Sequence, residues 1–183
     1  MRVIAGTARS LPLKTVPTKD VRPTTDKTKE TLFNILMPYI YECRFLDLFA
    51  GSGAIGIEAI SRGAKAAVFV ERDRAAQRVI EENLAFTKFT DKSRLLKMDV
   101  LAAPARLQNE EPFDIIFMDP PYDNGLEKQV LELLKDSPLV TDETIIVVEA
   151  SKETDFSYLE SLGFEAFKDK LYKNNRHIFI RKM

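Results

Sequence analysis

The sequence has very few of the residues that build disulfides or metal sites. Cys43 is its only cysteine and His177 its only histidine. One cysteine excludes an intramolecular disulfide, and the two residues are too far apart in the chain to suggest a zinc site together. We therefore predict no metal. Cys43 is interpreted as a core residue, and His177 as structural or as a minor contact to a ligand.

Long apolar segments are also missing. Runs such as Ile145 to Val148 are far shorter than the roughly 20 residues that span a bilayer. The first residues lack the apolar core of a signal peptide, so we expect no membrane segment and a cytoplasmic protein. The 183 residues, 45% hydrophobic and 30% charged, suit one packed domain, and we expect a monomer.

The net charge is only -1, but basic residues gather at both ends of the chain. Residues 1–30 hold seven lysines and arginines against three acidic residues, and residues 165–183 hold six against two. If the two ends share one face, they could neutralise the phosphates of a nucleic acid. A solvated surface explains the same charges, and composition alone leaves both readings open.

The order of apolar and amphipathic segments predicts an α/β fold with a mostly parallel sheet. The expected strands cover residues 45–49, 67–71, 94–98, 114–118 and 144–149, and the expected helices cover 26–37, 54–62, 73–86, 100–108, 124–135 and 155–161. Two further strands, about 164–171 and 177–182, flank Lys173-Asn174-Asn175. Asparagine tolerates the left-handed backbone of turns, so the chain should end in an antiparallel hairpin.

Residues 1–25 differ in character from the rest. Pro12, Pro17 and Pro23 interrupt short apolar stretches there, a pattern that indicates a small hairpin followed by an extended arm. Thr25 or Asp26 is suited to cap the helix that follows. We therefore divide the chain into an amino-terminal hairpin and arm, residues 1–25, and a main domain, residues 26–183.

A glycine-rich turn follows the first expected strand of the domain. Residues 50–56 read Ala-Gly-Ser-Gly-Ala-Ile-Gly, a G-x-G-x-x-G pattern at the start of a helix. Gly51 and Gly53 let the backbone approach a ligand, and Gly56 lets the helix pack closely on a strand. A tight turn without a ligand would look the same, so the pattern needs support from other residues.

Three carboxylates near this turn supply that support. Glu71 ends the second strand, where a carboxylate accepts both hydrogens of a ribose diol. Asp47 lies in an apolar strand and needs a partner, either a cationic or amino-bearing ligand or nearby backbone amides. Asp99 follows the third strand and is suited to an adenine amine or to a helix cap. The residues expected to contact the cofactor are Asp47, Phe49, Gly51, Ser52, Gly53, Glu71, Arg72, Asp99, Val100 and Asp119.

The most specific motif is Asp119-Pro120-Pro121-Tyr122 at the end of the fourth strand. The prolines stiffen the turn and leave carbonyl groups free to face a ligand. Asp119 and the Pro120 carbonyl can accept hydrogen bonds from an exocyclic amine, while Tyr122 stacks on the base that carries it. We therefore predict Asp119, Pro120 and Tyr122 as catalytic. A rigid turn with a structural tyrosine is the alternative.

These motifs resemble the Rossmann-type methyltransferases that methylate amino groups. The matching segments are Phe45 to Glu58, Ser61 to Ala64, Glu71, and Asp119 to Tyr122. Arg2 to Gly6, Arg22 to Asp26 and Lys29 to Asn34 narrow the resemblance to the bacterial RsmD-type guanine-N2 methyltransferases of 16S rRNA, over essentially the whole chain. The resemblance implies a seven-stranded sheet, S-adenosylmethionine as cofactor, and a guanine of 16S rRNA within a partly assembled small subunit as substrate.

The basic amino-terminal segment is expected to grip this RNA. The residues assigned to RNA binding are Arg2, Arg9, Lys14, Arg22, Thr24 and Lys29. Ala5, Lys29 and Lys173 to Arg176 depart from the family pattern on the RNA-facing side. The catalytic loop alone also allows methylation of adenine N6, cytosine N4 or a protein glutamine. From another class, a nucleotide-binding assembly factor without catalysis stays open.

Overall fold

The computed structural model describes residues 1–16, 25–122 and 124–183. Seven strands form one sheet in the order β3-β2-β1-β4-β5-β7-β6. The strands are β1 (Arg44–Asp47), β2 (Ala66–Val70), β3 (Ser93–Leu96), β4 (Ile115–Met118), β5 (Ile145–Ser151), β6 (Phe164–Leu171) and β7 (Asn175–Lys182). The helices are α1 (Asp26–Ile40), α2 (Ala54–Ser61), α3 (Arg74–Thr87), α4 (Ala103–Leu107) and α5 (Leu126–Leu134).

The topology confirms the predicted fold class. Strands β1 to β5 pair in parallel, whereas β7 pairs antiparallel with both β5 and β6. The carboxyl ends of the neighbouring strands β1 and β4 lie where the strand order reverses, β2 and β3 on one side and β5 on the other. Open α/β sheets bind ligands at such a position.

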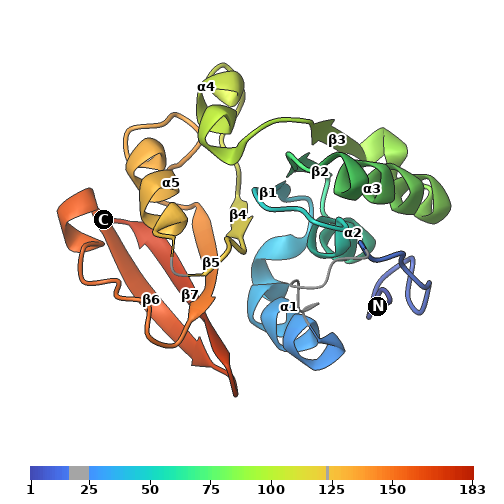
Figure 1. The fold of residues 1–183 in the computed structure, drawn as a ribbon, viewed down its shortest axis with the longest axis horizontal. Coiled ribbons are helices and arrows are strands. Elements are labelled where there is room, and N and C mark those ends of the chain that lie inside the picture. The colour runs from blue at the N-terminus through green and yellow to red at the C-terminus, as the bar shows by residue number, and fades with distance from the viewer. Residues whose placement is uncertain (17–24, 123) are drawn as a thin grey trace.

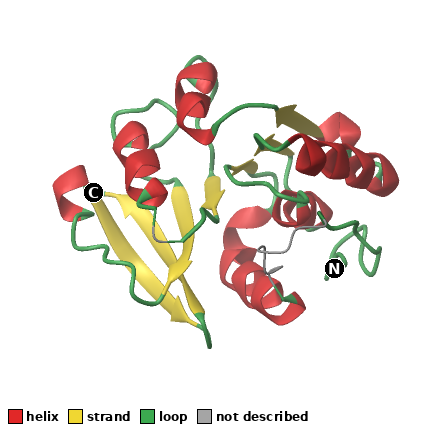
Figure 2. Ribbon diagram, in the orientation of Figure 1, coloured by secondary structure: helices red, strands yellow, loops and turns green. Residues whose placement is uncertain are grey.

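Alternating side chains of each strand divide the core into two layers. Phe45, Phe69 and Phe117 pack with α1, α2 and α3 on one face of the sheet. Leu46 and Ile116 pack with α4 and α5 on the other. Figures 1 and 2 show this arrangement, with α1 to α3 on one side of the strands and α4 and α5 on the other. Cover on both faces explains why β2, β4 and most of β5 are continuous apolar runs.

The amino-terminal residues form a compact hairpin-like turn on the α1, α2 and α3 layer (Figure 1). Arg2 pairs antiparallel with Pro12, and the Val3 amide donates to the Leu11 carbonyl at 3.0 Å. Val3 and Leu13 are buried. The expected arm, with Arg22 and Thr24, lies outside the described residues. Thr25 caps α1 as predicted, because its hydroxyl accepts from the Thr28 amide at 3.2 Å.

Two predicted helices differ from the structure. Residues 155–161 form turns and a short 3-10 helix, Glu160–Leu162, instead of an α-helix. The Asp155 carboxylate accepts from the Ser157 amide at 2.9 Å, a local bond that competes with helix formation. The segment 100–108 is divided into a 3-10 turn, Val100–Ala102, and α4. The hairpin of β6 and β7 is confirmed, and the Tyr172 amide donates to the Asn175 carbonyl across its turn at 2.8 Å.

Candidate active site at the ends of β1 and β4

The glycine-rich turn joins β1 to α2 in a conformation that requires glycine. Gly51 and Gly53 have φ angles of 54° and 77°, in the left-handed region that side chains disfavour. Gly56 has a different role. A Cβ built on it would lie 2.3 Å from the Cε1 atom of Phe69 in β2. The expected close approach of helix and strand at Gly56 is therefore confirmed.

A cavity of about 310 Å³ opens beside this turn. Its walls come from the glycine-rich turn, the ends of β2, β3 and β4, and the first residues of the chain. The predicted cofactor residues that line it are Phe49, Gly51, Ser52, Glu71, Arg72, Asp99, Val100 and Asp119. Asp47 and Gly53 are not among the lining residues. Residues spread over seventy positions of the sequence thus meet around one space of ligand-binding size.

Glu71 holds the glycine-rich turn in place. One carboxylate oxygen accepts from the Gly51 amide at 2.8 Å, and the other accepts from the Asp73 amide at 2.8 Å. A carboxylate has about four lone-pair positions, so these two bonds leave acceptor positions for the hydroxyls of a ribose. Glu71 also lines the cavity.

Asp47 is buried and incompletely paired. Its Oδ2 atom accepts from the Gly56 amide at 3.3 Å, whereas Oδ1 has no hydrogen-bond partner among the described residues. Burial raises the pKa of Asp47 to about 7, the nearby charge of Glu71 adds to this rise, and the Gly56 bond opposes it. A cationic or amino-bearing ligand next to this carboxylate would stabilise its charged form. The unpaired oxygen therefore fits a charged cofactor such as S-adenosylmethionine.

Asp99 caps the turn that follows β3 and also lies at the wall of the cavity. Its Oδ1 atom accepts from the Leu101 amide at 3.0 Å, which caps the turn that follows β3. Its Oδ2 atom lies 3.3 Å from the Arg72 guanidinium. Since both residues also line the cavity, the cap leaves Asp99 next to the space for a ligand.

Part of the predicted catalytic loop borders the other side of the cavity, whereas Pro120 and Tyr122 are not among the lining residues. Asp119 follows β4 directly, and Asp119 and Pro121 line the cavity. Burial raises the pKa of Asp119 well above its usual value, and the charges of Glu149 and Asp47 raise it further. Tyr122 is 40% exposed and donates from its hydroxyl to Glu149 at 3.3 Å. A half-buried acceptor and an open aromatic ring therefore stand side by side.

The sequence interpretation missed Glu149, which is only 4% exposed in β5. Besides Tyr122, its carboxylate binds Asn175 and the Nε2 atom of His177, the latter at 2.9 Å. The sequence does contain a feature that could have identified Glu149. A carboxylate directly after the apolar run 145–148 is expected to be buried and to need partners, just as Asp47 does. His177 is fully buried, in agreement with its structural interpretation.

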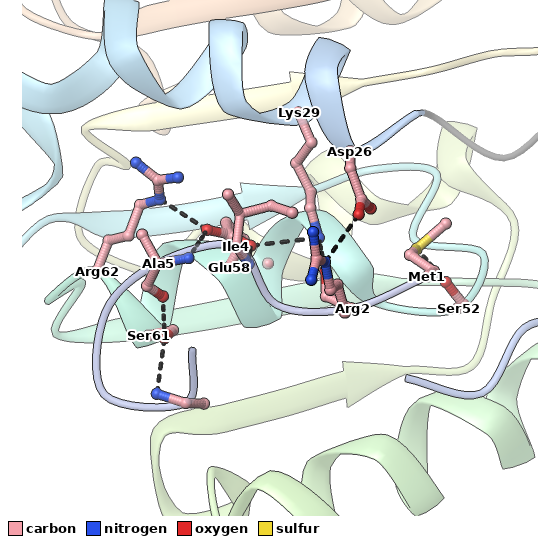
Figure 3. Close-up of polar contacts among 12 residues, drawn as sticks. Met1, Arg2, Ile4, Ala5, Asp26, Lys29, Ser52, Glu58, Ser61 and Arg62 are labelled. Carbon is pink, nitrogen blue, oxygen red and sulfur yellow. Dashed lines mark hydrogen bonds and ion pairs between the residues drawn. The ribbon is translucent and has the colours of Figure 1, made fainter. Parts of the chain in front are cut away.

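The assignment of Lys29 to RNA binding is corrected by the structure. Lys29 has no exposed surface. Its ammonium group donates to the Arg2 carbonyl at 2.6 Å and lies 3.2 Å from the Glu58 carboxylate. Figure 3 shows Lys29 pointing from α1 toward Glu58 of α2 beneath the amino-terminal segment. Lys29 lines the inner side of the cavity and is not on the outer surface where an RNA phosphate would lie, and its contacts fasten the hairpin to the domain.

Glu58 is the centre of this attachment (Figure 3). It also accepts from the Ile4 and Ala5 amides at 2.8 and 3.0 Å and from the Arg62 side chain at 2.7 Å. Ser61 adds a bond to the Ala5 carbonyl at 2.6 Å. One buried carboxylate thereby joins α1, α2 and the amino-terminal hairpin.

The other described candidates for RNA binding lie on the surface. Arg9 is exposed, Arg2 pairs with Asp26 at 3.0 Å, and Lys14 pairs with Glu82 at 2.8 Å. Exposed ion pairs of this kind contribute little to the stability of the protein. A phosphate of the RNA can therefore replace the carboxylate as the partner of Arg2 or Lys14. Within residues 1–16, 25–122 and 124–183, no group of three or more metal-ligating side chains is assembled. No helix of these segments is long and apolar enough to cross a membrane.

Comparison with known proteins places this geometry in a family. Residues 1–181 match the model of the family described as conserved hypothetical protein 95. The chain belongs to this family. Two relatives carry the name ribosomal RNA small subunit methyltransferase D. The Escherichia coli protein is 40% identical over 84% of this chain and 76% of its own length. The Haemophilus influenzae protein is 38% identical over 84% and 80%.

Solved structures agree with this family membership. The yhhF protein of Escherichia coli, which carries a methyltransferase name, superposes with a TM-score of 0.85 at 35% identity and covers 100% of this chain and 97% of its own. The resemblance to RsmD-type methyltransferases and the Rossmann-like fold are therefore confirmed. In this family member, the cavity lies between the glycine-rich turn and the Asp119 loop.

Proposed function

We propose that this protein transfers a methyl group from S-adenosylmethionine to the exocyclic N2 of a guanine in 16S rRNA. It acts as a cytoplasmic monomer on a partly assembled small ribosomal subunit. One observation carries the proposal: Asp119 and Pro121 share a cavity with Gly51 and Glu71. An amine-binding loop and a nucleoside-binding loop thus face the same space.

The cavity residues fit the cofactor. Glu71 would bind the ribose and Asp99 the adenine amine. Asp47 does not line the cavity, but the positive charge of a cofactor bound nearby would favour its charged form. When bound, S-adenosylmethionine supplies a methyl group activated by its sulfonium charge. Arg72 and Val100, which also line the cavity, would complete the adenosine site.

The Asp119 loop would orient the target amine. The lone pair of the guanine amine is delocalised into the ring, so it is a poor nucleophile and depends on orientation. Asp119 and the Pro120 carbonyl would accept its hydrogens, while Tyr122 stacks on the base. Hydrogen bonds from the amine favour the charged carboxylate, which offsets the raised pKa of Asp119. The N–CH3 bond would form as the S–CH3 bond of the sulfonium breaks, which leaves a neutral thioether, and the nitrogen would then pass one proton to the Asp119 carboxylate.

The RNA would be held by the basic residues 1–25 outside the cavity. Arg2, Arg9 and Lys14 contribute from the described hairpin, and Arg22 and Thr24 from the segment that follows. The names of the relatives favour ribosomal RNA over DNA or protein as the substrate. The basic hairpin agrees with this choice, since counterion release from phosphates drives such binding.

The test is to identify the modified nucleoside. The protein is incubated with labelled S-adenosylmethionine and naked 16S rRNA, intact small subunits or duplex DNA, and the product is digested and analysed. We expect N2-methylguanosine from the rRNA or the subunits, whereas N6-methyladenine would overturn the proposal.

Asp119→Ala should lower turnover by about 10²- to 10³-fold, as loss of one transition-state contact does elsewhere. Cofactor affinity should fall far less than turnover. Asp136→Ala is the matched control, because that side chain is 87% exposed. Normal turnover in Asp119→Ala would contradict the role of the loop.

A further inference from the structure

We infer that Glu149 is a positioning residue, which ties the catalytic Tyr122 to the carboxy-terminal hairpin and so fixes the ring that receives the target base. The inference rests on the proposed function, because it assigns Tyr122 its stacking role. Glu149 belongs to β5, Tyr122 follows β4, and the groups that hold Glu149 from the other side belong to β7.

The carboxylate of Glu149 is engaged at both oxygens. Oε1 accepts from the Tyr122 hydroxyl at 3.3 Å and from the Asn175 amide. Oε2 accepts from His177 Nε2 at 2.9 Å. A buried carboxylate needs such partners. Two residues of β7 therefore fix the position of the Glu149 carboxylate, and its hydrogen bond to the Tyr122 hydroxyl in turn fixes the position of that side chain.

Strand register brings these groups together. In the antiparallel pair of β5 and β7, Glu149 lies opposite His177, and Ser151 lies opposite Asn175. Residues 175 and 177 are two positions apart and thus point to the same face of the strand. The Glu149 carboxylate lies on that face and meets both side chains.

A second layer fixes the histidine. The Tyr172 hydroxyl lies 3.1 Å from His177 Nδ1, and its ring meets the imidazole edge-on at 4.9 Å between centroids. A neutral histidine that donates from Nε2 to Glu149 and accepts at Nδ1 from Tyr172 satisfies both ring nitrogens. The relay runs from Tyr172 through His177 and Glu149 to Tyr122.

This arrangement is better suited to orienting the Tyr122 ring than to stabilising the fold. Tyr122 is held at its hydroxyl, while the residue as a whole is 40% exposed, which leaves room for its ring to stack on a base. Burial and the charge of Glu149 raise the pKa of Tyr122, so the hydroxyl stays protonated and donates. Fixing one end of an exposed ring is a way to orient a substrate in advance of binding.

The experiment is a double-mutant cycle with Tyr122→Phe, Glu149→Gln and the double variant, in the full chain. Methyl transfer to 16S rRNA gives kcat and KM, calorimetry gives the Kd of S-adenosylmethionine, and thermal unfolding reports folding. Tyr122→Phe loses only the hydroxyl. Glu149→Gln places an amide where the carboxylate accepts from donors on both sides, so one of these bonds is lost. Tyr41→Phe is the matched control, because Tyr41 is 80% exposed.

We expect each single variant to lose about tenfold in kcat/KM for RNA, since small misplacements cost this much or more. The Kd of the cofactor should stay within twofold. The double variant should lose no more than the worse single one, because both changes break the same link. Multiplying losses would show that Glu149 acts independently of Tyr122 and would overturn the inference.

Tyr122→Phe keeps the test decisive if Glu149→Gln does not fold. A kcat/KM of Tyr122→Phe within twofold of the wild type would by itself refute the anchoring of the ring. These outcomes differ from a failure of the proposed function, in which the wild-type protein forms no N2-methylguanosine. In that case the acceptor has to be identified first, and the inference falls with the stacking role on which it rests.

Discussion

Replacing Glu58 with alanine should release the amino-terminal hairpin from α2 and destabilise the whole domain. The Glu58 side chain has 0% exposure, and its cationic partners Lys29 and Arg62 have 1% and 6%. The Ile4 and Ala5 amides bind the same carboxylate. The alanine variant leaves two cations and two amide groups without their acceptor.

Removing one partner of a buried pair typically costs about 3–5 kcal/mol. Two responses keep the loss from exceeding this range. Burial lowers the pKa of Lys29, so this group can lose its proton. Arg62 stacks on Phe33 at 5.0 Å and retains that contact. At about 2–4 °C per kcal/mol for a domain of this size, the expected loss of melting temperature is on the order of 10 °C.

Urea unfolding of Glu58→Ala measures this free energy, with Glu82→Ala as the control. Glu82 forms an exposed pair with Lys14, with side chains 53% and 68% exposed, which should contribute below about 1 kcal/mol. Limited proteolysis should also cut the hairpin of Glu58→Ala first. If the two variants unfold at the same urea concentration, the buried network does not hold the hairpin.

Three further predictions concern the turn, the buried aspartate and the RNA surface. Gly56→Ala should destabilise the domain by about 1–3 kcal/mol in urea, because the new methyl group would lie 2.3 Å from Phe69; an unchanged midpoint would contradict the close packing. The pKa of Asp47 rises from 3.8 to about 7 on folding, so the folded protein favours the protonated carboxyl group. The free energy of unfolding is therefore highest below pH 3.8 and falls as the pH rises to about 7. The free energy of unfolding of Asp47→Asn should therefore rise relative to that of the wild type between pH 4 and 8, by at most about 4 kcal/mol. A difference between the two proteins that does not change with pH would refute this. Arg9→Ala and Lys14→Ala should each reduce the salt slope of RNA binding by about 1, and an unchanged slope would remove that residue from the RNA surface.

Local patterns in the sequence were enough to predict the two loops that border the cavity. Gly51 and Gly53 were recognisable because few residues other than glycine adopt their left-handed backbone. The Asp119 loop was recognisable because two prolines after an apolar strand leave little choice of conformation. Both patterns depend only on residues that are close together in the chain, so they can be recognised from the sequence alone.

Contacts between distant segments were not predictable in this way. Lys29 resembles a surface cation in the sequence, yet the fold buries it against Glu58, twenty-nine positions further along. One local contact was missed as well: residues 155–161 have a helical pattern, but the Asp155 carboxylate accepts from the Ser157 amide two positions further along. In each case a specific hydrogen bond outweighs the general preference of the residue type.

The sequence by itself determined the order of the strands, most of the helices, the positions of the glycine-rich turn and the Asp119 loop, and the family resemblance, because these follow from the spacing of apolar, glycine and proline residues. The tertiary structure decided which charged groups are buried and which partners they have. It brought Glu149 to Tyr122 and His177, and Glu58 to the amino-terminal hairpin. Burial and pairing arise from strand register and helix packing, which join residues that the sequence keeps apart.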